Sequence, residues 1–472
     1  MQLVIYFLMI VTYTHTDYPA LKFLLSEKGL RAVSQMLSVQ IQSKLKSTEI
    51  SEYRGKRDIK IGTVHYVLSN MRVVECSMPD PSLVFVEGTG VSVEVSQLTL
   101  AITGKWATQF GIIHANLPGS FDLAVYNIHI YTLLQLADDA GRLSITTVQC
   151  SANVGDVNIQ FHGGARFFFK PFVSGFSGQI SDMIREKICP AIQQAINGSE
   201  ETLQEIPVNI TVDQYISLSI PLTSSPAVTH QSFELDIKGE FYSRSSPSEP
   251  PFSASVFDVP YAENYMLSVA ASEFLVNSAA YAFLSSGALQ INITDDMIPK
   301  SFLIHLNTSQ FGAFIPQLRT LYPNMEMQVL LYASETPLFS FSSGVIDIHV
   351  PAAAKFSAVK PDGTLVPLFR LDVDGSFSGS ARIDQNLTGA FQLKNLTLTL
   401  GSSEIGDFKT DTLEQMMAVM AVESVLPKLD AALKAGFPLP TLKGFRLINS
   451  QLLIKNGFVA IFTDVQDSLT GL

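Results

Sequence analysis

Long apolar stretches and charged residues are both scarce in this 472-residue chain. No run reaches the 18 or so apolar residues that a membrane-spanning helix needs, so no membrane anchor is expected. Charged residues make up 16%, and 31 Lys+Arg stand against 43 Asp+Glu, a formal net charge of -12. Nucleic-acid binding needs clustered bases to neutralise phosphates, so this balance excludes a general nucleic-acid binder. The hydrophobic fraction of 47% excludes a disordered chain and suits two or three folding units.

The sequence motifs of catalytic, metal and nucleotide sites are missing. Neither GxxxxGK[ST] nor GxGxxG occurs, and there is no HExxH or CxxC among the scattered histidines and three cysteines. Gly175-Phe-Ser177-Gly178 lacks the spacing of a nucleophile elbow. Asp372-Val-Asp374-Gly375 lacks the later acids of a calcium loop. We therefore predict a protein that is not an enzyme and that holds no metal or cofactor.

The N-terminus predicts secretion. An apolar run from Leu3 to Val11 precedes the short polar stretch Thr12 to Thr16, which is typical of a signal peptide over residues 1–16; a buried first strand is the alternative. Six glycosylation sequons agree with secretion: Asn197, Asn209, Asn292, Asn307, Asn386 and Asn395. In an oxidising compartment the three cysteines, Cys76, Cys150 and Cys189, predict one disulfide and one free thiol, and their spacing does not choose the pair.

Two amphipathic helices are expected to flank a long meander in the first half. Apolar residues of the first helix, over 21–45, recur at steps of three and four: Leu30, Val33, Leu37, Ile41 and Leu45. Residues of the second, over 172–196, repeat every four: Phe176, Ile180, Ile184, Ile188 and Ile192. Pro190 should kink or restart this helix. Between the helices, alternation such as Phe121, Leu123 and Val125 predicts antiparallel strands.

The same plan returns after a proline-rich segment that begins at Ser243. A helix over 265–284, strands over about 288–400 and a helix over 412–433 follow. Pro427 of the last helix matches Pro190 at an offset of 237 (427 − 190), with apolar neighbours aligned. We therefore predict two similar domains, 17–242 and 261–472, joined by a linker over 243–260.

Basic residues gather near the N-terminus. From Lys22 to Lys60 there are nine bases and four acids, a local balance of +5. The dense part, Lys44 to Lys60, is expected to be a loop that enters a strand. It is either an ordinary solvated loop or a patch for an anionic lipid.

Several short motifs, in order along the chain, resemble one known family. They are Lys28-Gly-Leu30, Gly104-Lys-Trp106, Lys238-Gly-Glu-Phe-Tyr-Ser243, Asp295-Asp-Met-Ile-Pro-Lys300, Tyr322-Pro-Asn-Met325 and Gly436-Phe-Pro-Leu-Pro-Thr441. They are similar to the family of bactericidal/permeability-increasing protein and lipopolysaccharide-binding protein, which includes plasma lipid transfer proteins. The resemblance implies an α+β fold: an elongated boomerang of two similar barrel domains, each a highly twisted antiparallel sheet with two helices, joined by a central β-sheet.

The resemblance also implies sites. It implies a disulfide between Cys150 and Cys189 and a phospholipid bound in an apolar pocket of each barrel. Helix residues expected to line the N-terminal pocket, with core packing as the alternative, are Val33, Leu37, Ile41, Phe176, Ile180 and Ile184. Lipopolysaccharide contacts are expected in basic loops at the N-terminal barrel tip: Lys44, Lys46, Arg54, Lys56, Arg57 and Lys60, with Lys105 and Trp106 from a neighbouring hairpin.

Two functions follow from the resemblance. The first is a secreted, extracellular protein of innate immunity that binds lipopolysaccharide and phospholipid and defends against Gram-negative bacteria at their outer-membrane surface. The alternative is an extracellular lipid carrier or transfer protein with little lipopolysaccharide affinity. Residues 1–230 carry 16 bases and 19 acids, a net charge of −3, where the bactericidal members are basic. This departure keeps the alternative open, because apolar pockets do not depend on surface charge.

Overall fold

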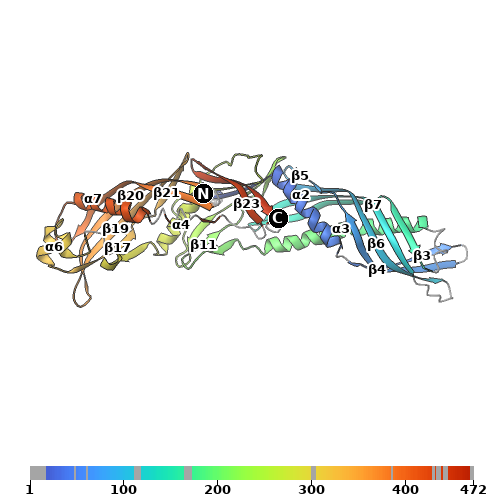
Figure 1. The fold of residues 1–472 in the computed structure, drawn as a ribbon, viewed down its shortest axis with the longest axis horizontal. Helices are drawn as coiled ribbons and strands as arrows, with labels where there is room; N and C mark the ends of the chain where they lie inside the picture. Colours follow the sequence, from blue (N-terminus) through green and yellow to red (C-terminus); the bar gives the residue numbers. More distant parts are fainter. Residues whose placement is uncertain are drawn as a thin grey trace, which may run out of the picture.

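The computed structural model describes residues 18–46, 49–59, 62–110, 119–163, 173–298, 304–383, 386–427, 431, 437–438 and 445–467. The predicted signal peptide lies outside these residues. The molecule is long and gently bent, with a strand-rich lobe at each end and a shared region in the middle (Figure 1). Its sheets are antiparallel and curled, so the predicted α+β fold is confirmed.

The N-terminal lobe is an eight-stranded sheet in the order β2-β4-β6-β7-β8, with β3 on β4, β5 on β6 and β9 on β7. The strands are β2 (Glu49–Ile50), β3 (Tyr53–Ile59), β4 (Gly62–Ser77), β5 (Ser82–Val86), β6 (Gly90–Phe110), β7 (Gly119–Asp139), β8 (Arg142–Asn153) and β9 (Val157–His162). Helix α2 (Glu27–Lys46) packs on β4 and β5, and α3 (Val173–Gln204) packs on β8 and β9. The second helix is longer than predicted and continues through Pro190 without a restart.

Side-chain alternation and bulges explain how this sheet curls. Phe121 and Val125 of β7 are fully buried, whereas Asp122 between them is exposed, as the alternation predicts. Asn70, Gln97 and Asn127 adopt left-handed φ angles of 51°, 59° and 54° where the strand registers shift. Such bulges bend a strand and increase its twist. The sheet therefore wraps around a core that helices α2 and α3 close.

A six-stranded sheet in the middle joins the two halves, in the order β12-β13-β1-β15-β24-β23. Its strands are β1 (Leu21–Ser26), β12 (Ala227–Val228), β13 (Ser232–Ile237), β15 (Leu267–Ser272), β23 (Phe445–Lys455) and β24 (Phe458–Asp467). The predictions of helices over 21–45 and 265–284 were wrong for their first residues. These residues form strands β1 and β15, and helices α2 and α4 (Glu273–Ser285) begin only after them. These two strands pair with each other, Leu21 opposite Ala271.

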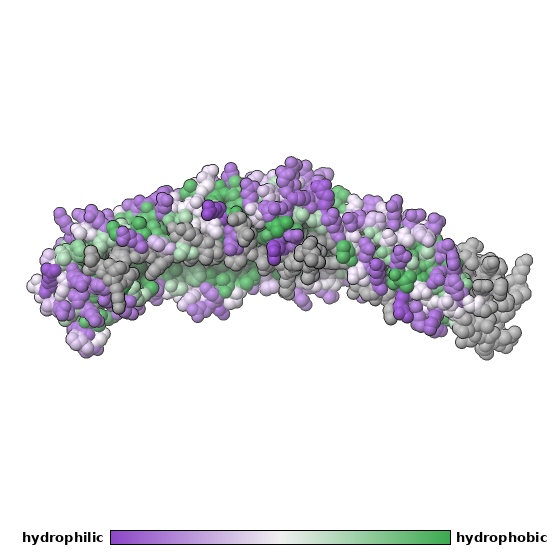
Figure 2. Space-filling view, in the orientation of Figure 1, coloured by the Kyte–Doolittle hydropathy of each residue, from purple (hydrophilic) through white to green (hydrophobic). Residues whose placement is uncertain are grey.

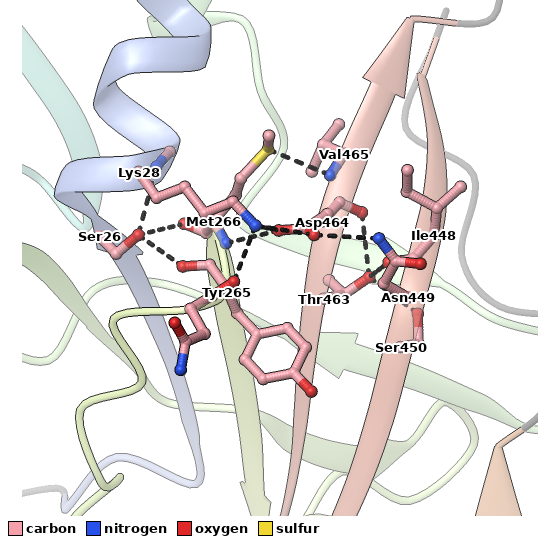
Figure 3. Close-up of polar contacts among 12 residues, drawn as sticks. Ser26, Lys28, Tyr265, Met266, Ile448, Asn449, Ser450, Thr463, Asp464 and Val465 are labelled. Carbon is pink, nitrogen blue, oxygen red and sulfur yellow. Dashed lines mark hydrogen bonds and ion pairs between the residues drawn. The ribbon is translucent and has the colours of Figure 1, made fainter.

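A polar cluster secures this middle sheet (Figure 3). Lys28 Nζ, at the start of α2, donates to both carboxylate oxygens of Asp464 in β24, at 2.8 and 2.9 Å. The backbone N–H of Met266 and the amide of Asn449 also donate to Asp464, at 3.1 and 3.2 Å. Ser26 Oγ donates to the carbonyl of Tyr265 at 2.6 Å. Segments from the beginning, the middle and the end of the chain therefore meet at one buried carboxylate.

The C-terminal lobe is a seven-stranded sheet in the order β16-β17-β19-β20-β21-β22, with β18 on β19. The strands are β16 (Gln290–Ile293), β17 (Glu326–Ala333), β18 (Leu338–Ser342), β19 (Val345–Val359), β20 (Leu365–Ile383), β21 (Asn386–Ser403) and β22 (Phe437–Pro438). Its helical segments are η3 (Asp295–Met297), α5 (Thr308–Phe311), α6 (Pro316–Leu321), α7 (Asp411–Met420) and the π-helical η4 (Ala421–Val425). Of the helix predicted over 412–433, the described part is α7, the π-helical turn η4 and helical residues at 426–427 and 431; the remaining residues lie outside the description.

A small sheet lies beside the middle region, where α4 packs on its strand β14. It is built from β10 (Asn209–Thr211), β11 (Ile216–Ser219) and β14 (Glu240–Ser243). Residues 244–260, which follow β14, form neither helix nor strand.

Candidate functional site

Strand β3 lies at the far end of the N-terminal lobe (Figure 1). Exposed basic side chains of β3 and of the strands beside it share one surface there. In the β3–β4 hairpin, Lys56 lies opposite His65 and Arg54 opposite Val67. Strand β4 pairs in turn with β6, where Ser69 lies opposite Lys105. Paired and alternate residues share one face of a sheet. The exposed basic and imidazole side chains of this surface, named here the outer basic face, are Arg54, Lys56, His65 and Lys105, and the exposed Asp58 lies on the same face.

The outer basic face is compact and accessible. Arg54 and Lys105 lie two strands apart, which corresponds to about 10 Å across the sheet. The Arg54 side chain is 78% exposed and forms an ion pair with Glu52, Nε to Oε1 at 2.6 Å. Because both partners are exposed, this pair contributes little and a stronger anion can replace Glu52. The surface can therefore bind phosphate groups.

The structure does not gather every predicted base at this face. Lys46, at the end of α2, lies close to Cys76, and its positive charge opposes the rise in the pKa of that thiol that burial causes. Cys76 is nine residues along β4 from Val67, the partner of Arg54, or about 30 Å of strand. Lys46 is therefore separate from the outer basic face.

Three predicted bases are not fully described. Lys44 belongs to α2 and Arg57 pairs in β3 with Val64, but their side chains are outside the description, as is all of Lys60. The expected loop over 44–60 is corrected to a helix end and a β-hairpin.

Trp106 lies beneath the outer basic face and not on it. Its side chain is 2% exposed. The indole N–H donates to the carbonyls of Ser120 and His162, at 2.9 and 3.2 Å, and the ring meets Phe161 edge-on at 6.0 Å. Neighbouring residues of a strand point to opposite faces, so the exposure of Lys105 requires Trp106 to point inward. The prediction that Trp106 is a surface contact is corrected by this burial.

The interior of the N-terminal lobe is apolar and is closed by the two helices. Ile180 of α3 is 1% exposed within the core, and Ile41 and Ile184 pack against that core. Val33 is half-buried on α2. The side chains of Leu37 and Phe176 are outside the description. Ile41, Ile180 and Ile184 thus face the interior, as the helical period predicts, and pack in or against the core; lining of a lipid pocket by any of the six stays a prediction.

A separate pocket of about 430 Å³ opens beside the first turns of α2. Leu30, Leu83 and Phe85 give it apolar walls, and Arg31 and His230 lie at its edge. Acidic and polar residues share the lining: Glu27, Asp80, Ser34, Gln35 and Ser82. None of the six residues predicted to line a lipid pocket belongs to it. No local sequence pattern indicates this pocket, because its walls come from segments that are about 50 to 200 residues apart.

Helix α3 is fixed to β8 in two places. A disulfide joins Cys150 to Cys189, with Cα atoms 5.8 Å apart, and this is the pair that the resemblance implies. Cys76 is a free, buried thiol. Further along, the backbone N–H of Ile145 donates to Glu200 at 2.6 Å, and this bond is the main reason that the pKa of Glu200 lies below its usual range.

The predicted glycosylation sites differ in exposure. Asn197, Asn209, Asn292 and Asn395 are exposed, whereas Asn386 is half-buried. Asn307 caps α5, because its Oδ1 accepts the N–H of Ser309 at 2.8 Å. Glycosylation at all six stays a prediction.

Within the described part of the chain, no helix is long and apolar enough to cross a membrane. The same residues contain no group of three or more His, Cys, Asp or Glu side chains that could hold a metal ion. Hydrophilic residues cover much of the displayed surface, with apolar patches between them (Figure 2).

Comparisons with known proteins agree with this architecture. The N-terminal domain of the LBP / BPI / CETP family matches residues 29–204, and its C-terminal domain matches residues 210–467. The chain is 35% identical over 451 residues to a bactericidal permeability-increasing protein of Sebastes schlegelii, covering 95% of each. It is 28% identical to human lipopolysaccharide-binding protein, over 95% of this chain and 94% of that protein. A crystal structure of lipopolysaccharide binding protein superposes with a TM-score of 0.61 at 25% identity, over 95% of this chain and 99% of that one. The chain belongs to the LBP / BPI / CETP family.

Proposed function

We propose that this protein is a secreted, non-catalytic lipid-binding protein of innate immunity that binds bacterial lipopolysaccharide. The outer basic face is the observation that carries the proposal. It presents Arg54, Lys56 and Lys105 together at one end of a protein whose net charge is -12. The names of the relatives, bactericidal permeability-increasing protein and lipopolysaccharide-binding protein, support the same ligand.

The phosphates of lipid A suit this surface chemically. Arg54 can bind a phosphate through two parallel hydrogen bonds, and Lys56 and Lys105 act as point charges beside it. Each base near an anionic surface adds about 1 kcal/mol, an attraction that is screened over about 10 Å at 0.1 M salt. Because the exposed carboxylates of Glu52, just before β3, and Asp58, within β3, lie beside these bases, the affinity is lower than a purely basic tip would give.

Apolar sites in the same lobe hold phospholipid in this proposal. The core under α2 and α3 consists of apolar side chains around Ile180, and the pocket beside Leu30 joins apolar walls to a polar edge. A lipid whose acyl chains displace core contacts and whose headgroup remains at a polar edge fits this distribution. The bacterial outer-membrane surface, which displays lipopolysaccharide, is then the proposed site of action.

The alternative function, an extracellular lipid carrier with little lipopolysaccharide affinity, is favoured by one observation. Residues 1–230 have a net charge of −3, so long-range attraction to an anionic membrane is weak.

A paired charge removal separates the two functions. The variant Arg54→Ser/Lys56→Ser should bind lipopolysaccharide at least tenfold more weakly at 0.1 M salt, because two bases of about 1 kcal/mol each are lost and the Glu52 carboxylate, no longer paired, repels the phosphates. Its affinity should also depend less on salt. The control Lys360→Ser/Lys455→Ser removes the same charge from exposed positions elsewhere and should bind as the wild type does. If the wild type and both variants all bind lipopolysaccharide equally weakly, while phospholipid is still extracted from each, the carrier function holds instead.

A further inference from the structure

A second pocket lies at the opposite end of the molecule. Helix α6 forms the far end of the C-terminal lobe, away from β3 (Figure 1). Between α6 and the segment before α7 is an open pocket of about 560 Å³. Its lining combines residues of both segments: Phe314, Pro316, Gln317, Thr320, Leu321, Phe408 and Lys409. This volume is within the range of sites that bind small organic ligands.

The apolar wall of this pocket is rigid. Phe408 packs edge-on against Phe369, with ring centroids 5.0 Å apart, and Phe369 stacks on Phe356 at 4.5 Å. Phe369 and Phe356 are 4% and 5% exposed within the core of the lobe. Phe408 is therefore held in position from behind, and a ligand that contacts it meets a preformed surface.

On the other side of the pocket, apolar side chains are exposed to solvent. Leu321, on the last turn of α6, is 55% exposed. Phe314 and Phe408 are half-buried. Covering such side chains with an acyl chain contributes roughly 25 cal/mol for each Å² that is removed from water. Binding of one acyl chain in this pocket is therefore favoured by the burial of these apolar side chains.

Polar groups at the pocket define the headgroup. Of the described residues that line it, Lys409 is the only charged one, and its side chain is exposed. Gln317 Nε2 donates to the carbonyl of Asp407 at 3.0 Å and so fixes the loop to α6. The other amide atom, Gln317 Oε1, is buried without a hydrogen-bond partner among the described residues. Because this oxygen is buried, a ligand in the open pocket cannot reach it, and Lys409 alone selects the headgroup.

We propose that this pocket binds a single-chain lipid that carries an anionic headgroup, which is the chemistry of a lysophospholipid such as lysophosphatidic acid. The acyl chain lies along Leu321 and Phe408, and the phosphate meets Lys409. This site is separate from the lipopolysaccharide face and from the interior of either lobe, so it does not depend on the proposed function.

Photolabelling tests the position of the site. The full-length, delipidated protein is incubated with lysophosphatidic acid that carries a diazirine in its acyl chain, irradiated and mapped by peptide mass spectrometry. Label is expected in residues 314–321 and 404–410. Label confined to peptides of other segments would overturn the proposal, even if total lipid uptake were high.

Two variants and a control test the chemistry. Thr320→Trp places a large ring in the pocket from an exposed position and should reduce labelling of this site about tenfold. Lys409→Glu should weaken labelling by lysophosphatidic acid about fivefold but leave a monoacylglycerol probe of the same chain length unchanged. Lys360→Glu, an equal charge reversal at an exposed turn of the same lobe, should change neither. If Lys409→Glu weakened both probes equally, or neither, the assignment of an anionic headgroup would be wrong.

Discussion

Removing the Asp464 carboxylate should destabilise the joint between the two halves of the molecule. Asp464→Asn keeps the side-chain volume but loses the charge that Lys28 contacts at 2.8 and 2.9 Å. The Asp464 side chain is 9% exposed and that of Lys28 is 36% exposed. Losing one partner of a fully buried pair costs about 3–5 kcal/mol. Because Lys28 can turn toward water and the new amide can still accept one hydrogen bond, we expect a loss of about 2 kcal/mol.

The stability that Asp464 contributes should also depend on pH. Burial alone would raise the pKa of Asp464, but hydrogen bonds from Lys28, Asn449 and the Met266 N–H, with the charge of Lys28, hold it below its usual range. A carboxyl with a lowered pKa in the folded state stabilises the fold above its unfolded pKa, near 3.9, and this stability is lost as pH falls through the folded value. The wild type should therefore lose its advantage over Asp464→Asn only below about pH 4.

Urea unfolding followed by circular dichroism at pH 7 and at pH 3 measures both effects. Asp347→Asn is the matched control, because Asp347 forms an ion pair with Lys394 at the same 2.8 Å but on the surface. Surface pairs contribute about 0–1 kcal/mol, so this variant should lose much less. The assignment of a stabilising joint is refuted if both variants unfold at the same urea concentration, or if the effect of Asp464→Asn is the same at both pH values.

Two further predictions concern the N-terminal lobe. Replacing Cys150 and Cys189 with Ser should lower the free energy of unfolding by about 3–4 kcal/mol, since the disulfide closes a loop with a sequence separation of 39. Unreduced peptide maps should show these two joined and Cys76 alkylated only after denaturation; a Cys76–Cys150 peptide would contradict the structure. Trp106 should resist acrylamide quenching, because it is 2% exposed, and free access of the quencher to the native protein would show that its position is wrong.

The sequence predicts side-chain direction better than it predicts proximity. Alternation placed Phe121 inside, and the same rule, applied to Lys105 and its neighbour, would have placed Trp106 inside as well. The sequence analysis missed His65. The register of β3 on β4 places His65 opposite Lys56, and this register cannot be predicted from the residues of either strand alone. Lys46 was grouped with Arg54 because they are close in sequence, yet a helix end and a hairpin separate them.

Long-range pairing explains the errors in secondary structure. Strand β1, Leu21–Ser26, is mostly apolar and pairs along both of its edges, with β13 and with β15. A short apolar run of this kind cannot be told from the first turns of the helix that follows it. The same error recurs at β15 because this strand, too, runs directly into a helix. The contact between Lys28 and Asp464 spans 436 residues, so no local pattern could indicate it.

The position of β24 in the middle sheet has a consequence for synthesis on the ribosome. Strands β1, β13 and β15 are complete by residue 272, but β24, which covers the free edge of β15, ends at Asp467. At a translation rate of about 5–20 residues per second, Asp464 is synthesised roughly 20–90 seconds after Lys28, the residue whose charge it neutralises. Until then β15 presents an unpaired edge, a template for pairing with other chains. The nascent chain is therefore exposed longest at its middle sheet. A stop codon just before β23 would keep the pairing of β1 with β15 but leave that edge of β15 open and Lys28 without Asp464.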